Sequence, residues 1–296
     1  MDDCPLPSIA AVGNTCSTCR PIYDEIAQHR FQQISQRFFG DLADQLPMVL
    51  YRSKGAITGS TVQEVLSGPT GSPPRDLNIV VPKGYFLVME DRMLRQYYKE
   101  YEEPEVNDMM DFNLQQFQAY KWDSRIVTVS ESLGPDIMDI IVNSPTTTDM
   151  NLMTAGGVVS LFPRHTLAYD GLLGPTGGWD LKEGGRFGSV NGVRAAVQVD
   201  NRNTKEDCGP RCPSLWRFVR TDRNTLRLNW DRRYTVQDII ENSQMEWRVS
   251  IECLNPVCKY GVHKKLEGRS FTYSEMPATN YQIVNRQRDI AYRVPV

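Results

Sequence analysis

The sequence predicts an α+β fold, in which a small mixed sheet with flanking helices is followed by a β-rich segment. Short apolar runs rich in β-forming residues alternate with segments of helical periodicity over the first 170 residues. Clusters of glycine and proline separate these segments, and beyond residue 170 most of the segments alternate as strands do. A chain of this kind buries its apolar faces by packing helices against a sheet.

Size and composition restrict the class of protein. The chain has 296 residues, of which 40% are hydrophobic and 23% charged, as in ordinary soluble domains. The net charge of −3 argues against a protein that coats nucleic acid by charge alone. No apolar run is long enough to span a membrane, and the acidic N-terminus lacks a secretion signal. We therefore expect no membrane contact and a cytoplasmic or nuclear location.

The N-terminal half divides into a leader and a core. Residues 1–22 are rich in Pro, Ser, Thr and Cys, which predicts a flexible leader. From residue 22 to 50 apolar side chains recur at helical intervals, with an interruption at Pro47. The core then continues through these expected elements: strand 56–58, helix 61–66, strand 77–81, helix 85–101, strand 125–130, strand 137–142 and helix 148–159. We assign residues 23–170 to this core.

Residues 171–296 form the predicted β-rich C-terminal segment. It begins with a glycine-rich stretch to residue 195, which we interpret as a long loop, and residues 193–199 can form a strand after it. Alternating segments then surround one helix-like stretch, with expected strands at 215–219, 225–230 and 246–253 and a helix at 236–242.

Two short motifs point to phosphate and metal chemistry. Gly59-Ser60 precedes a predicted helix, where backbone N–H groups can hold phosphate and glycine allows close approach. Asp76 and Asn78 are two residues apart on a predicted strand, so their side chains project to the same face. Asp139 lies within another apolar run, where a carboxylate must be paired or reach solvent.

These residues resemble the DNA polymerase β-like nucleotidyltransferase superfamily. The matching segments are Thr58-Gly59-Ser60-Thr61, Arg75 to Pro82, and Met138-Asp139-Ile140-Ile141. The chain resembles still more closely a set of such proteins, of unassigned activity, that is expanded in mushroom-forming fungi, and Cys212 to Arg217 is also similar to that set. The motif resemblance covers roughly residues 22–165, and it carries no function to the later part.

The resemblance implies a site with named roles. Gly59 and Ser60 contact phosphate, Asp76 is the first metal ligand, Asn78 stands at the second, and Asp139 is the third acid. Nucleotidyl transfer uses two metal ions, and hard cations such as Mg²⁺ prefer carboxylates. Asn78 departs from the family's Asp-x-Asp pattern, since a neutral amide supplies no charge and cannot act as a base. The fold is therefore expected with altered or lost catalysis. The alternative is that Asp76-Leu77-Asn78 merely ends a loop.

The cysteines suggest a second metal. Cys208 and Cys212 form one close pair and Cys253 and Cys258 another, as in structural zinc sites, and His263 can replace one of them. The alternative is ordinary buried thiols. Cys16 and Cys19 have the spacing of a metal knuckle but lie in the expected leader, where we favour a chance pairing or a weak metal contact over a functional site.

Arginine and aromatic residues alternate between Arg211 and Arg233, including Arg217 and Arg220. Such a pattern can bind single-stranded nucleic acid, although arginines on the wet face of strands with aromatics on the core face are its commoner cause.

The sequence thus predicts a nucleotidyltransferase-like protein that binds a nucleoside triphosphate and Mg²⁺, with weakened or lost nucleotidyl transfer and an unidentified protein or RNA acceptor. The alternatives are a non-catalytic, zinc-stabilised interaction protein and an RNA-binding accessory factor.

Overall fold

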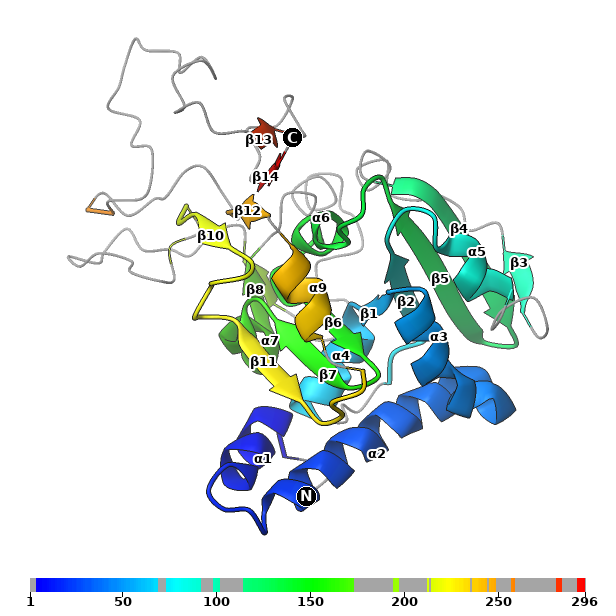
Figure 1. Cartoon of the computed structure of the whole chain (residues 1–296), viewed down its shortest axis with the longest axis horizontal. Coiled ribbons are helices and arrows are strands. Elements are labelled where there is room, and N and C mark those ends of the chain that lie inside the picture. Colours follow the sequence, from blue (N-terminus) through cyan, green and yellow to red (C-terminus); the bar gives the residue numbers. More distant parts are fainter. Residues whose placement is uncertain are drawn as a thin grey trace.

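A computed structural model describes residues 4–68, 73–91, 98–101, 114–172, 194–196, 212, 214–234, 236–243, 245–248, 257–258, 281–283 and 292–295. An eight-stranded sheet forms its centre, in the order β11-β7-β6-β1-β2-β5-β4-β3 (Figure 1). The strands are β1 (Ala56–Thr58), β2 (Asp76–Val81), β3 (Lys99–Tyr101), β4 (Leu114–Trp122), β5 (Arg125–Ser132), β6 (Asn151–Thr154), β7 (Gly157–Ser160) and β11 (Leu226–Asn229).

The sheet is mixed, as predicted. β2 pairs with β5 in parallel, and the other neighbours in this sheet are antiparallel. Two apolar clusters lie on its opposite faces, so the molecule has helices on both sides of the sheet. Along β2 the side chains of Leu77, Ile79 and Val81 enter one cluster, whereas that of Val80 enters the other.

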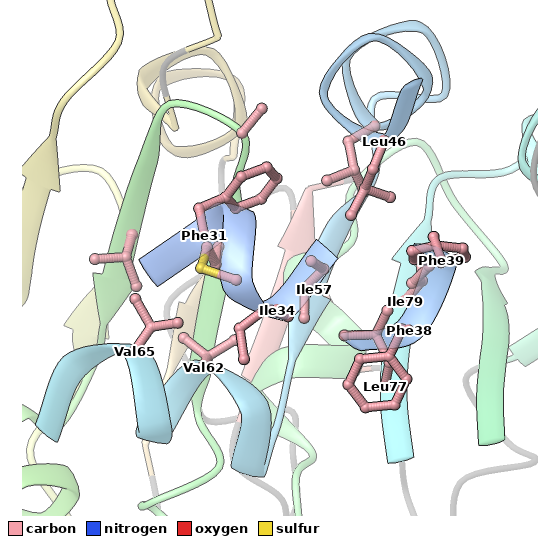
Figure 2. Packing of buried hydrophobic residues seen from close by; sticks show 14 of the residues in the cluster. Phe31, Ile34, Phe38, Phe39, Leu46, Ile57, Val62, Val65, Leu77 and Ile79 are labelled. Atoms are coloured by element: carbon pink, nitrogen blue, oxygen red, sulfur yellow. The ribbon is translucent and has the colours of Figure 1, made fainter. Parts of the chain in front are cut away.

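The first face is covered by helices from the N-terminal third of the chain. These are α1 (Leu6–Gly13), α2 (Arg20–Phe39), the 3-10 helix η1 (Gly40–Gln45), α3 (Leu46–Arg52), α4 (Ser60–Ser67) and α5 (Phe86–Met89). Figure 2 shows Phe31 and Ile34 of α2 close to Val62 of α4 and Ile57 of β1, and these side chains are buried. Each such side chain contributes roughly 1.5–3 kcal/mol by leaving water.

The expected flexible leader is partly a helix. Leu6 and Ile9 of α1 are buried in the same cluster as α2. The Arg30 guanidinium donates to the Cys4 carbonyl at 2.5 Å and to the Val65 carbonyl at 2.8 Å, which ties the start of the chain to α2 and α4. The buried positions Leu6, Ile9, Ala10 and Gly13 recur at helical intervals, so this stretch carried a helical signal that the composition of the leader hid.

Three elements differ from the sequence prediction. The run 137–142 is not a strand but the helix α6 (Met138–Val142). The segment 148–159 is not a helix but contains most of the hairpin β6–β7. Gly156 lies in its turn, where a side chain would overlap the Asp231 carbonyl oxygen. The predicted helix 85–101 is reduced to α5, and its end forms β3; residues 92–97 lie outside the described part.

The described parts of the C-terminal segment are β-rich, as predicted. The described strands β10 (Arg217–Phe218), β12 (Glu246–Trp247), β14 (Tyr292–Pro295) and β13 (Tyr281–Ile283) form a sheet in that order. β8 (Asp170–Leu172) pairs in parallel with β9 (Arg194–Ala196). β11 joins the central sheet, and the second apolar cluster takes in α6 and α9 (Gln237–Asn242). The boundary expected at residue 170 therefore does not separate the two cores.

The remaining described helix is α7 (Pro163–Ala168), next to α4. None of the described helices is long and apolar enough to cross a membrane.

Candidate functional site

The turn between β1 and α4 is built around Gly59. This residue has φ 80° and ψ −152°, a conformation that is essentially restricted to glycine. A Cβ added to Gly59 would lie 3.2 Å from the side-chain nitrogen of Asn78. The Gly-Ser turn and the Asp-x-Asn strand are therefore packed directly together, which the two motifs alone could not show.

Asp76 and Asn78 lie at the start of β2 and point to the same face of the sheet. Asn78 stands opposite Thr58 on β1 and opposite Thr128 on β5. Because directly paired residues project to one face, three polar side chains form a row across three neighbouring strands. Asp76 lies one step beyond this row.

Both polar atoms of the Asn78 amide form a hydrogen bond. Its nitrogen donates to Asp76 Oδ2 at 2.7 Å, and its oxygen accepts from the Thr128 hydroxyl at 2.7 Å. An ionised carboxylate only accepts hydrogen bonds, so the nitrogen of the amide must face Asp76. The Thr128 hydroxyl can donate or accept, so it does not itself restrict the orientation of the amide.

Asp149 is the second carboxylate of the site, and the sequence interpretation missed it. It precedes β6 and accepts a hydrogen bond of 2.6 Å from the Thr146 hydroxyl. Although its side chain keeps a partial opening to solvent, burial raises the pKa of Asp149 to about 6, and the negative charge of Asp76 adds to that rise. The polar run Thr146 to Asp149 was the available signal, but a helix was expected there.

Asp139 does not join Asp76. It lies on α6, and both of its carboxylate oxygens accept from the Ser132 hydroxyl, at 3.1 and 2.9 Å. Ser132 ends β5 six residues after Ile126, the partner of Asp76. Six residues of strand span roughly 20 Å, so Asp139 lies at the opposite end of this strand pair. The assignment of Asp139 as the third acid is therefore corrected.

The environment of Asp139 explains its place in an apolar run. Burial raises the pKa of Asp139 to about 7; the nearby Asp136 raises it further, while the hydrogen bonds from Ser132 and the Ile140 N–H lower it. The carboxyl group is thus paired by local hydrogen bonds, not by a metal-binding partner from β2.

A cavity of about 660 Å³ lies at this same far end. Its walls include Gly55 before β1, Pro82 after β2, Asp136, and Ser243 after α9. The Ser243 hydroxyl donates to Asp136 at 2.6 Å, and burial raises the pKa of Asp136. The candidate site consists of Gly59, Ser60, Asp76, Asn78 and Asp149, and we call it the Gly59–Asp76 site. None of these residues lines the cavity. The cavity and the polar row of Thr58, Asn78 and Thr128 therefore lie at different places. We assign the candidate site to the polar row.

The donor set of the site fits one Mg²⁺ better than two. Mg²⁺ takes oxygen ligands, and Asp76 and Asp149 are close enough for their charges to interact. A third oxygen can come from Asn78 if its amide turns over. Within the described ranges no three Asp, Glu, His or Cys side chains gather as a metal site.

Two of the four predicted zinc ligands meet. The sulfurs of Cys212 and Cys258 lie 3.2 Å apart, and both side chains are buried. This separation exceeds the ~2.05 Å of a disulfide bond. It approaches the roughly 3.8 Å between two thiolates that bind one tetrahedral zinc through bonds of ~2.3 Å. Cys208, Cys253 and His263 lie outside the described residues.

The arginine-rich segment divides into two groups. Arg220, Arg223, Arg232 and Arg233 are exposed, as expected for a wet face, whereas Arg217 and Arg227 are used within the fold. Arg217 is buried, pairs with Asp222 at 3.0 Å, and lies over the rings of Phe162 and Trp247. Arg227 donates to the Val219 carbonyl at 2.8 Å. Arg217 is therefore on the core side, not on the expected wet face, and is not available to a nucleic acid.

Comparisons with known proteins give partial likenesses. No family model and no curated protein matches the chain. Among solved structures, one described as a CCA-adding enzyme in apo form I matches 53% of this chain and 40% of its own, at 13% identity and a TM-score of 0.37. Two described as a tRNA-processing enzyme, one in apo form I and one in complex 3, give TM-scores of 0.33 and 0.34 at 13% and 12% identity. These two matches cover 46% and 45% of this chain and 37% and 36% of theirs. This chain thus spans about two fifths of each of these structures, and likenesses at such TM-scores carry no inference about its activity.

Proposed function

We propose that the chain is a nucleotidyltransferase-like protein that binds a nucleoside triphosphate with Mg²⁺ and has weakened or lost nucleotidyl transfer. The observation that carries this proposal is the hydrogen bond from the Asn78 amide to the Asp76 carboxylate. In the Asp-x-Asp arrangement that position holds a second carboxylate, whose charge a pair of metal ions requires. Here it holds a neutral donor.

The phosphate groups are assigned to the start of α4. Gly59 presents no side chain there, and the α4 N-terminus supplies backbone N–H groups and a partial positive charge. Ser60 adds a hydroxyl at the first position of the helix. Thr61 donates to the Asp76 carbonyl at 2.9 Å and holds the helix start against the metal-binding strand.

The metal is assigned to Asp76 and Asp149, with Asn78 as an adaptable neighbour. If Asn78 turns its amide, its oxygen faces the cation and its nitrogen faces Thr128. The Thr128 hydroxyl can then accept from the amide nitrogen where it now donates to the amide oxygen. Metal binding of this kind can order the triphosphate. With one charge fewer than an Asp-x-Asp strand supplies, the site is poorly suited to clamp both attacking and leaving oxygens.

Binding is tested with ATP, GTP, CTP and UTP by calorimetry, with and without Mg²⁺. We expect saturable, Mg²⁺-dependent binding that Asp76→Ala removes. The control is Asp41→Ala, which alters an exposed carboxylate on η1 away from the site. Transfer of labelled nucleotide to RNA or protein is measured in parallel and is expected to be slow or absent. Equal nucleotide binding by wild type and Asp76→Ala contradicts the proposal.

The pairing of Cys212 and Cys258 favours a second candidate function, a zinc-stabilised interaction protein. Zinc bound by these thiolates, together with Cys208 and Cys253, would link parts of the C-terminal segment that are distant in sequence. We expect close to one equivalent of zinc in the purified protein and a lower melting temperature with chelator. Cys212→Ser should lose the bound zinc and the effect of chelator on the melting temperature. Cys4→Ser, at an exposed thiol, should keep the zinc and the effect of chelator. Less than half an equivalent of zinc in the wild type argues against this staple.

A further inference from the structure

Cys16 and Cys19 face each other in the turn between α1 and α2. Their sulfurs lie 3.0 Å apart, and the Cys19 N–H donates to the Cys16 carbonyl at 3.2 Å, as in a β-turn. Such a turn holds its first and fourth Cα atoms within ~7 Å, close to the range that a disulfide requires. Cys19 is the N-cap residue of α2, a helix of 20 residues.

The two sulfurs differ in their surroundings. Cys16 is exposed, and its sulfur also accepts from the Cys19 backbone N–H at 3.3 Å. Cys19 is partly buried. The Cys16 sulfur is therefore open to a reagent and accepts a hydrogen bond. The less exposed Cys19 sulfur is close enough to attack it. Neither residue belongs to the Gly59–Asp76 site or to the candidate zinc site.

We propose that Cys16 and Cys19 form a thiol–disulfide exchange site. The reduced pair passes two electrons to a low-molecular-weight disulfide, and neither a metal nor a nucleotide takes part. Cys16 is the attacking sulfur and Cys19 the resolving one. The proposal is independent of the nucleotide-binding function.

The pKa values of the two thiols agree with these roles. The side-chain and backbone hydrogen bonds from Cys19 hold the pKa of Cys16 below its usual value, so more of it is thiolate near neutral pH. The same contact raises the pKa of Cys19, which stays protonated until the second step. The partial positive charge at the start of α2 also favours a thiolate in this turn.

The reaction balances in two steps. The Cys16 thiolate attacks one sulfur of the disulfide RSSR; a Cys16–SR bond forms, the S–S bond breaks, and RS⁻ leaves and takes up a proton. Cys19 then gives its proton to solvent and attacks the Cys16 sulfur, which forms the Cys16–Cys19 bond and releases a second RS⁻. Two electrons pass from the protein dithiol to RSSR, and two RSH result.

The test uses the full chain and glutathione disulfide as the probe, with the modified peptides identified by mass spectrometry. In the wild type we expect an internal Cys16–Cys19 disulfide, lighter by ~2 Da than the dithiol, because each bond formed removes two hydrogens. Cys19→Ser should instead accumulate a glutathione mixed disulfide on Cys16. Cys16→Ser should react at position 19 at least about tenfold more slowly, because the remaining thiol lacks the lowered pKa.

Exposed Cys4 provides the internal comparison, and urea-unfolded protein the second measurement. In the folded chain Cys16 should react faster than Cys4, and unfolding should remove the difference, since the surrounding turn and helix produce it. The proposal is overturned if Cys16 and Cys4 react equally fast in the folded chain. It is also overturned if the wild type ends with separate glutathione adducts on Cys16 and Cys19.

Discussion

The Asn78 side-chain nitrogen lies 2.7 Å from Asp76 Oδ2 and donates a hydrogen bond to it. A carboxylate at position 78 could not make this contact, because two like charges on adjacent same-face positions of one strand repel unless a cation lies between them. The amide therefore lets the site fold without metal. Because residue 78 is Asn and not Asp, the site also lacks the charge that would bind a second metal ion.

Replacing Asn78 by Asp should make the protein depend on Mg²⁺. Without the metal we expect Asn78→Asp to lower the free energy of unfolding by about 1–3 kcal/mol, from the lost hydrogen bond and the added repulsion. With Mg²⁺ much of this loss should return, and Mg²⁺ affinity should exceed that of the wild type. Thermal unfolding over a Mg²⁺ series measures both. Asn78→Ala is the control that loses the hydrogen bond without adding charge, and an identical Mg²⁺ response of the two variants would argue against the metal assignment.

Gly59→Ala should weaken both the fold and nucleotide binding. The backbone of the alanine would have to adopt a conformation that only glycine takes easily, and its Cβ would approach the Asn78 nitrogen. We expect these two effects to cost roughly 1–3 kcal/mol. Gly84→Ala is a matched control, because Gly84 has φ 87° but open space around the position of a Cβ. Urea unfolding should show a loss in both variants, and calorimetry should show weaker ATP binding only for Gly59→Ala. Similar ATP binding by the two variants would contradict the assignment of phosphate to this turn.

Mg²⁺ binding should depend on the protonation of Asp149. Its pKa of about 6 lies above the ordinary value, chiefly because of burial and then because of Asp76. Protons and Mg²⁺ compete for a carboxylate, so Mg²⁺ affinity should fall as the pH drops through about 6. In Asp76→Asn the pKa of Asp149 should move down, which carbon-detected NMR of the carboxyl group can follow. A pKa of Asp149 that is unchanged by this substitution would show that the two carboxylates are not electrostatically linked.

Asp139 should make stability fall as the pH rises toward neutrality. Its folded-state pKa of about 7 exceeds its ordinary value, so between these values the folded protein holds more protons than the unfolded chain. The resulting contribution is complete at acidic pH and is lost as the pH passes through about 7. Asp139→Asn should flatten this part of the pH profile of unfolding and leave Mg²⁺-dependent ATP binding intact. An effect of the size of a few kcal/mol is expected at pH 8. Loss of nucleotide binding in Asp139→Asn would indicate that Asp139 contributes to the nucleotide site after all.

The local chain from β1 through α4 to β2 was well predicted from the sequence. Its apolar runs, its Gly-Ser turn and the alternation along Leu77 to Val81 all act over a few residues, so their structure follows from short-range rules. The elements after it were harder to predict. The apolar run 137–142 is short enough to form a strand or a helix, and in the fold it is a helix buried in the second apolar cluster.

The sequence by itself determined that Gly59, Ser60, Asp76 and Asn78 lie on one strand–turn–helix–strand segment, because these elements follow from short-range patterns. Tertiary structure alone decided which acid lies near Asp76. Asp139 lies at the far end of the β2–β5 pair, and Asp149 is brought beside Asp76 by the antiparallel pairing of β1 with β6. Strand register sets such distances between segments far apart in the chain, and residue spacing carries no information about register.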